Sequence, residues 1–182
     1  MLELVTAPTT AAVTLADAKA WLRVDHATDD AIITALVRSC EVAWEVATGM
    51  PVLVGTYRAD TCAGFAGQWC PPRTPVVAAV SVNVLDLEAG TITAVAAADW
   101  RLVRTAGGQV FEIDAGVIAG DESAQITWTA GYAAVQPLDR AWLLRSLAAA
   151  YRFRGDDPEG RGPAPDNAEK WLRQAVSRSV LA

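Results

Sequence analysis

The sequence predicts an α+β protein, in which an N-terminal helical hairpin and two C-terminal helices form a small bundle around an inserted antiparallel β subdomain. Apolar residues recur at helical spacing near both ends of the chain, whereas the middle alternates short β-branched segments with turns that contain Gly and Pro. With 182 residues, of which 52% are hydrophobic, the chain is long enough for one good core. The expected division of this single domain, residues 1–182, is a helical hairpin (1–50), a β insert (51–132), a central helix (133–155) and a loop with a C-terminal helix (156–182).

Two helices are expected in the hairpin. The first covers residues 15–24, with Thr14 as its N-cap. The second covers residues 29–48 and ends before a glycine, as helices commonly do. The apolar residues of the second helix keep helical spacing, which predicts one broad buried face and an exposed opposite face that carries Glu41 and Glu45.

The β insert is expected to be an antiparallel sheet, a sandwich or a small barrel, because its strands are short and separated by turns. Residues 64–75 are rich in Gly, Pro and Cys and predict a loop, and Gly107-Gly108 predicts a hairpin turn. The expected strands are residues 52–62, 76–87 (as one strand or two), 91–95, 100–105, 109–113 and 123–129.

The central helix has an unusual apolar surface. Pro137 suits its first turn and Gly155 follows its end. Between them, alanine, leucine and aromatic residues cover nearly all sides of the helix. Such a helix has to be covered on nearly every side, which places it at the centre of the domain or at a subunit interface. We expect part of this surface to stay uncovered in an isolated protomer.

A charged loop rich in Gly and Pro, residues 155–165, precedes the last expected helix. Asp166 caps this helix, with Glu169 at the third helical position as in a capping box. An amphipathic helix behind such a loop either closes its own domain or docks into a neighbour's groove, and the sequence leaves both open. Its apolar face consists of Trp171, Leu172, Ala175, Val176 and Val180, and its basic residues are Lys170, Arg173 and Arg178.

Charge is spread unevenly along the chain. The formal net charge is −6. Residues 1–139 carry 7 basic and 16 acidic side chains, a net of −9, whereas residues 140–182 carry 8 basic and 5 acidic side chains, a net of +3. This asymmetry indicates that the C-terminal end faces a partner of opposite charge. It does not produce the strongly basic face of a nucleic-acid-binding protein.

The sequence predicts no catalytic site, no metal site and no cofactor. His26 is the only histidine. A metal cluster of His26 with Asp25, Asp29 and Asp30 is one interpretation, but acidic residues in the first turn of a helix are the favoured one, since they stabilise the helix dipole. Phosphate-binding, dinucleotide-binding and serine-hydrolase motifs do not occur in the sequence.

The cysteines and the N-terminus predict a cytoplasmic chain. Cys40, Cys62 and Cys70 have neither zinc-ligand spacing nor an even count, which favours free thiols over a disulfide. We expect no signal peptide and no membrane span. Most of the seven tryptophans fall on inward faces, and Trp69 and Trp171 are the two expected to be exposed for a partner.

Several short motifs follow one another in a characteristic order. They are VTAPTT (5–10), VTLADAKAWLRVD (13–25), DDAIITALVRSCE (29–41), ATG (47–49) and TAGY (129–132), the last followed by the helix that begins at Pro137. Each motif is short, but together they resemble the head–tail connector (adaptor) proteins of tailed phages, a family that gene transfer agents also use. The order of elements agrees over nearly the whole chain.

The resemblance implies a virion structural protein and not an enzyme. Such adaptors form a homo-oligomeric ring, commonly of twelve subunits, under the portal protein, extend the DNA channel and hold the stopper or tail-completion protein. DNA passes through the lumen without specific binding, no membrane is involved, and the particle neck is assembled in the bacterial cytoplasm. By analogy, the C-terminal segment binds the portal. The portal-binding residues implied here are Arg152, Arg154, Arg161, Lys170, Trp171, Leu172, Arg173, Val176 and Arg178.

Two other functions remain as alternatives. One is a stopper or tail-completion ring protein, a class that is dominated by β structure and therefore fits the expected helices less well. The other is a small hydrolase of phage origin, for which His26 and the Asp29/Asp30 pair are the best available residues.

Overall fold

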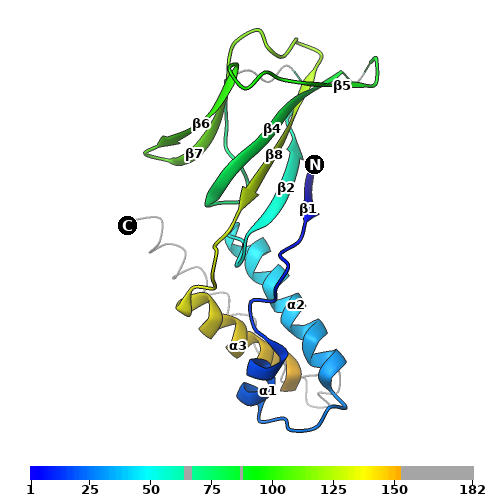
Figure 1. The fold of residues 1–182 in the computed structure, drawn as a ribbon, viewed down its shortest axis with the longest axis vertical. Helices are drawn as coiled ribbons and strands as arrows, with labels where there is room; N and C mark the ends of the chain where they lie inside the picture. Colours follow the sequence, from blue (N-terminus) through cyan, green and yellow to red (C-terminus); the bar gives the residue numbers. More distant parts are fainter. Residues whose placement is uncertain (64–66, 87, 153–182) are drawn as a thin grey trace, which may run out of the picture. The chain divides into compact units, whose positions relative to one another are not determined.

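The computed structural model describes residues 1–63, 67–86 and 88–152. The chain divides into two compact units. The β unit consists of Met1–Thr9 and Leu53–Ala133, and the helical unit of Thr10–Val52 and the chain from Ala134 onward, of which residues 134–152 are described. Within the described residues there are three helices and two antiparallel sheets, which confirms the α+β class (Figure 1).

The helical unit contains α1 (Leu15–Leu22), α2 (Asp30–Thr48) and α3 (Pro137–Arg152). The hydroxyl of Thr14 accepts a hydrogen bond from the backbone N–H of Asp17, which confirms the expected N-cap of α1. Gly49 ends α2 in the left-handed conformation that glycine adopts without strain. The expected helices 15–24 and 29–48 are therefore correct to within about two residues at each end.

The three helices pack on one another through aliphatic and aromatic side chains. The inner face of α2 is buried, and Trp44 on this face lies against Trp142 of α3, with ring centroids 5.0 Å apart. Ala18 of α1 is completely buried. The fourth helix of the expected bundle falls on residues 166–182, which lie outside the described part of the chain, so the four-helix arrangement stays a prediction.

Glu41 corrects one expectation from the sequence. The helical spacing of α2 placed it on the exposed face, but its side chain is buried in the structure. Its carboxylate accepts a hydrogen bond from the backbone N–H of Ala12 (2.6 Å) and one from the guanidinium of Arg38 (3.0 Å). A carboxylate with two such donors can be buried, because the hydrogen bonds replace its lost hydration.

Replacing Glu41 with alanine is expected to lower the free energy of unfolding of the helical unit by about 2 kcal/mol, because the buried N–H of Ala12 loses its acceptor. Glu41→Gln is the matched control. It keeps an oxygen for Ala12 and loses only the charge of the pair with the half-exposed Arg38, which contributes about 0.5 kcal/mol. Chemical denaturation followed by far-UV circular dichroism measures both. Equal losses for the two variants would contradict the role assigned to the Ala12 hydrogen bond.

The β unit contains eight strands in two antiparallel sheets (Figure 1). The five-stranded sheet has the order β1-β2-β8-β4-β5, and the three-stranded sheet has the order β3-β7-β6. The strands are β1 (Leu2–Thr6), β2 (Gly55–Asp60), β3 (Gly67–Trp69), β4 (Val76–Asp86), β5 (Thr91–Ala94), β6 (Trp100–Thr105), β7 (Gly108–Ile113) and β8 (Ser123–Ala130).

The core of the β unit lies between the two sheets. Trp128 of β8 is completely buried, and its ring meets Trp69 of β3 and Phe111 of β7 at centroid distances of 5.3 and 6.4 Å. Strands β8 and β2 alternate buried and half-buried residues, as expected for strands with one face in a core. The expectation that Trp69 is exposed for a partner is therefore wrong, because its ring packs on this core.

Two strands were not predicted from the sequence. Strand β1 is formed by the N-terminal residues and pairs with β2 in the five-stranded sheet. Strand β3 lies within the segment 64–75, which was expected to be a loop, and pairs with β7. The other six strands agree with the expected segments, and 76–87 forms one strand rather than two. Residues 1–9 thus belong to the β unit and not to the helical hairpin.

Candidate assembly surfaces

The implied portal-binding set is centred on the C-terminal end of the chain. Arg152, the last residue of α3, is exposed. The other eight residues of this set lie at positions 154–178, outside the described part of the chain. The same holds for Trp171 as an exposed partner residue, and for the cap at Asp166. Their role therefore stays a proposal.

The described part of the chain ends beside the start of α2. Tyr151, next to the end of α3, donates a hydrogen bond from its hydroxyl to the carboxylate of Asp29, which precedes α2. At the other end of the pair, Trp142 near the start of α3 contacts Trp44 near the end of α2. The two helices are therefore antiparallel, and Arg152 lies close to the N-terminal end of α2.

The central helix is covered on most sides, as its composition predicts, but not on all. Trp142, Leu143, Leu144 and Leu147 are buried, whereas Leu138 is 50% exposed. The expectation that part of its apolar surface stays uncovered is met at this residue. Asp139 in the same turn is also buried, and burial raises the pKa of its carboxyl group.

A second apolar row lies on the side of α2 that faces away from Trp44. We call it the outer row of α2; its members are Ile32, Ala35, Ser39, Val42 and Val46, spaced alternately by three and four residues. All five residues are exposed, and the exposed fractions of Val42 and Val46 are 48% and 71%. The helical spacing of the apolar residues, Ile32 among them, predicted one broad buried face for this helix, but Ile32 is 45% exposed, so the prediction is wrong for this residue. The regular three-and-four spacing was the signal for a separate row.

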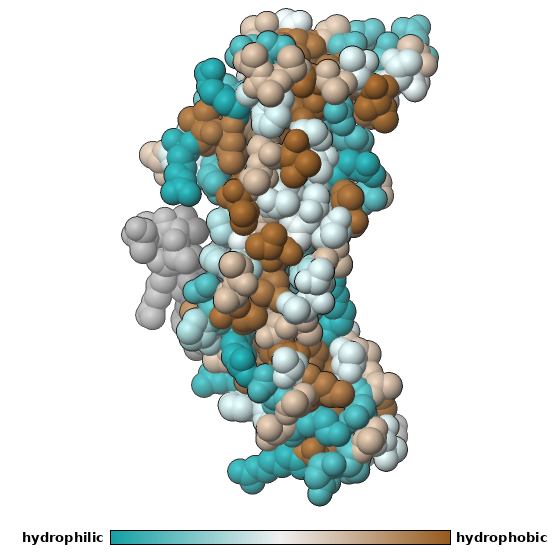
Figure 2. All heavy atoms as spheres, viewed as in Figure 1, coloured by the Kyte–Doolittle hydropathy of each residue, from teal (hydrophilic) through white to brown (hydrophobic). Residues whose placement is uncertain are grey.

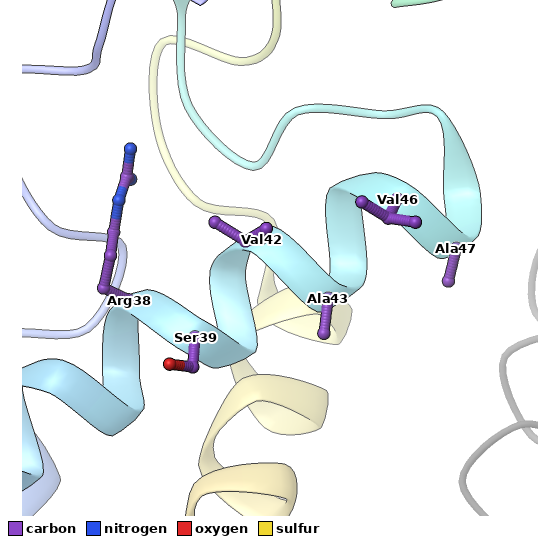
Figure 3. A pocket seen from close by; sticks show the side chains of 6 residues that line it. All are labelled: Arg38, Ser39, Val42, Ala43, Val46 and Ala47. Atoms are coloured by element: carbon purple, nitrogen blue, oxygen red, sulfur yellow. The ribbon is translucent and has the colours of Figure 1, made fainter.

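An open hollow of about 650 Å³ runs along this part of α2. The described residues that line it are Arg38, Ser39, Val42, Ala43, Val46 and Ala47. Figure 3 shows these side chains projecting from successive turns of the one helix. The lining is apolar or small apart from Arg38 and Ser39, which suits a helix or a peptide better than a polar small molecule.

The β unit also exposes apolar residues, and Figure 2 shows hydrophobic atoms at several places on the visible face of the molecule. Strands β1 and β5 are the edges of the five-stranded sheet, and both are exposed along their whole length. Val77 and Val80 of β4 are 58% and 53% exposed. Exposed edges and apolar side chains of this kind are typical of proteins that assemble with others.

The acidic residues around His26 hold the helical unit together. Lys19 of α1 donates to the carboxylate of Asp30 (2.6 Å) and to the backbone oxygen of His26 (2.8 Å). Asp29 accepts from Tyr151. The structure therefore supports the helix-start interpretation of these carboxylates, and the described residues contain no group of three or more side chains suited to hold a metal ion.

The three cysteines are free thiols in the structure, with Cys40 buried and Cys62 and Cys70 exposed. Burial, and secondarily the charge of Glu41, raise the pKa of the Cys40 thiol to about 11. Cys40 is thus an inert apolar residue of the helical core. None of the described helices is long and apolar enough to cross a membrane.

Comparison with known proteins gives one consistent result. No protein-family model matches the chain, and no curated protein matches it. Among solved structures, a chain in the virion of a native gene transfer agent particle is 25% identical, with a TM-score of 0.75 and coverage of 96% of this chain and 94% of that one. A chain in the neck of a native particle, computed with C12 symmetry, is 24% identical with a TM-score of 0.73, and covers 96% of this chain and 93% of that one.

A chain in the neck of an empty particle, computed with C6 symmetry, is similar as well, with 24% identity and a TM-score of 0.73. The similarity spans both the β unit and the helical unit, because it covers 96% of the chain. The chain therefore has the fold of a chain of the gene transfer agent particle and its neck, which agrees with the resemblance seen in the sequence.

Proposed function

We propose that this chain is an adaptor subunit of the neck of a gene transfer agent or phage particle. The observation that supports it best is the similarity of fold over 96% of the chain to chains of particle necks. The three described helices, which a β-dominated stopper would lack, favour an adaptor over a stopper or tail-completion protein. The structural character of the similar chains also supports a role in assembly rather than in catalysis.

The adaptor forms a ring, and the proposed ring contains twelve copies. One of the similar necks is computed with C12 symmetry, which supports this number. A ring needs two different patches on each subunit that fit each other head to tail. The exposed edges of the five-stranded sheet and the exposed apolar residues of α2 provide several candidates for such patches.

The C-terminal end attaches the ring to the portal protein. Residues 140–182 carry the net charge of +3, while the rest of the chain carries −9. A basic end is suited to an acidic surface on the portal, and long-range attraction speeds the encounter. The acidic remainder repels phosphates, so DNA passes through the channel of the ring without being held, and the opposite side of the ring takes the stopper protein.

Deletion of residues 166–182 tests the portal role. The truncated protein is expected to stay folded and soluble, because the Trp44–Trp142 contact of the helical unit and the cluster around Trp128 in the β unit are made by residues that it keeps, but to lose attachment to portal-bearing heads. Co-sedimentation of purified protein with heads measures this. A full-length variant with Asp156→Asn and Asp157→Asn is the control, because it changes charge in the same part of the chain while keeping every proposed contact residue.

Undiminished attachment of the truncated protein would contradict the portal role. Images of the full-length protein bound to the portal test the ring separately. Twelve copies around the channel are expected. Single copies, or a ring that binds only at the tail end of an existing neck, would contradict the adaptor assignment and favour the stopper alternative.

A further inference from the structure

We infer that, in the free protein, the outer row of α2 is the binding site of the chain's own C-terminal segment, residues 166–182. This inference concerns the protein before it meets any partner, and its test does not depend on the portal role; only the competition with the portal described below rests on the proposed function. It rests on the apolar surface of α2, on the place where α3 ends, and on the residue pattern of the segment.

The outer row makes α2 a helix with two packing faces. Its inner face, with Ile33, Val37, Cys40 and Trp44, is buried within the helical unit. The outer row has the same three-and-four spacing, with its members one or two residues before those of the inner face, and it is exposed. An apolar row at this spacing is the surface against which a second helix packs with interlocking side chains. The small side chains beside it, Ala43 and Ala47, allow a close approach.

The C-terminal segment has the matching pattern. The sequence predicts a helix with a single apolar face, which an isolated helix in water cannot bury. Seventeen helical residues extend over about 25 Å, and the outer row from Ile32 to Val46 extends over about 21 Å.

The connection is long enough and begins in the right place. The Tyr151–Asp29 hydrogen bond fixes the end of α3 beside the start of α2. The thirteen residues 153–165 can span up to about 45 Å, whereas all 19 residues of α2 extend over about 28 Å. The segment therefore reaches any position along the outer row.

Tethering selects the chain's own segment over a second copy. A segment held by a short link is present at an effective concentration in the millimolar range, far above that of a free protein in dilute solution. The same apolar face that would meet the portal is then covered until a partner competes for it. Binding to the portal and binding to α2 are then alternative states of residues 166–182.

Hydrogen exchange of the full-length protein tests the inference. Backbone amides of residues 166–182 are expected to exchange about tenfold or more slowly than in an unstructured peptide of the same sequence. The double variant Val42→Glu/Val46→Glu should abolish this protection, because charges replace the most exposed apolar groups of the row. Unchanged exchange in the inner residues of α2 verifies that the helical unit stays folded.

Val77→Glu/Val80→Glu is the matched control, with the same substitutions at similarly exposed valines of the β unit, and it should leave the protection intact. Three results would overturn the inference. One is exchange of residues 166–182 at the unstructured rate in the unmodified protein. Another is protection that survives Val42→Glu/Val46→Glu. The third is protection that appears only as protein concentration and molecular mass rise, which would show that a second copy provides the contact.

Discussion

Replacing Gly131 with alanine is expected to destabilise the β unit by about 3–5 kcal/mol, a large part of the stability of a typical domain. Gly131 follows β8 with a φ of +119°, where an L side chain is strained. A Cβ there would lie 2.3 Å from the carbonyl oxygen of Leu53 and 3.0 Å from the nitrogen of Val54. Both neighbours are backbone atoms, so they cannot move aside by changing rotamer.

A backbone shift that relieved the contact between this Cβ and Leu53 would also break backbone hydrogen bonds around the turn. The N–H of Gly131 donates to the oxygen of Pro75 (3.0 Å), and the N–H of Val54 donates to the oxygen of Tyr132 (3.1 Å). Gly90→Ala is the matched control, since Gly90 also has a positive φ, +66°, but nothing lies within 4 Å of its added Cβ. It should cost about 1 kcal/mol. Denaturant titration, followed by hydrogen exchange of the β8 backbone amides, measures the free energy of unfolding of the β unit in both variants. Equal losses of this free energy for Gly131→Ala and Gly90→Ala would contradict the steric argument.

Trp128→Ala is expected to lower the free energy of unfolding of the β unit by about 3–5 kcal/mol, because removing the ring leaves a cavity in the core. The Trp128 ring is completely buried and contacts Trp69, Phe111 and Tyr57. Its indole N–H also donates to the backbone oxygen of Arg73 (3.1 Å), so the substitution leaves that oxygen without its donor.

Trp21→Ala provides the comparison for Trp128→Ala, because the same side chain is removed from a site that is 51% exposed. It should cost less than about 1 kcal/mol. Denaturant titration, followed by hydrogen exchange of the β8 amides for Trp128→Ala and of the α1 amides for Trp21→Ala, measures each cost in the unit that carries the substitution. A cost for Trp128→Ala as small as that for Trp21→Ala would mean that the ring cluster does not stabilise this unit.

Helices and most strands were predictable because their signals are local. Thr14 and Gly49 mark helix ends through hydrogen bonds and dihedral angles that involve neighbouring residues only. The predicted strands contain β-branched residues between turn residues, which is a signal contained within each segment. For the same reason, Pro137 located the start of α3.

Strands β1 and β3 were missed because both depend on partners far away in the sequence. Leu2 of β1 is placed opposite Ala59, and Trp69 of β3 opposite Phe111. Neither strand has a strong local pattern, and the short β3 lies among turn-forming residues. Such tertiary pairing overrides local propensity.

Burial was harder to predict than secondary structure. Trp21 was expected on an inward face and is half exposed, whereas Glu41 was expected outside and is buried. The difference for Glu41 arises from the backbone N–H of Ala12, a donor that no periodicity reveals. The implied portal-binding residues are a separate matter: of these, the structure describes Arg152 alone, so the set rests on the resemblance and on charge.

The path of the chain through the β unit has a consequence for how the protein folds. Strand β2 lies between β1 and β8, pairing Leu2 with Ala59 on one side and Gly55 with Ala130 on the other. During synthesis the first strand is made early, but the sheet that contains it cannot be completed until β8 has been added, well after α1 and α2 have emerged. Folding rates fall as contacts become more distant in sequence, so the closing of this sheet is the slow step, and the edges of β2 and β4 that β8 covers are open to other chains until it occurs.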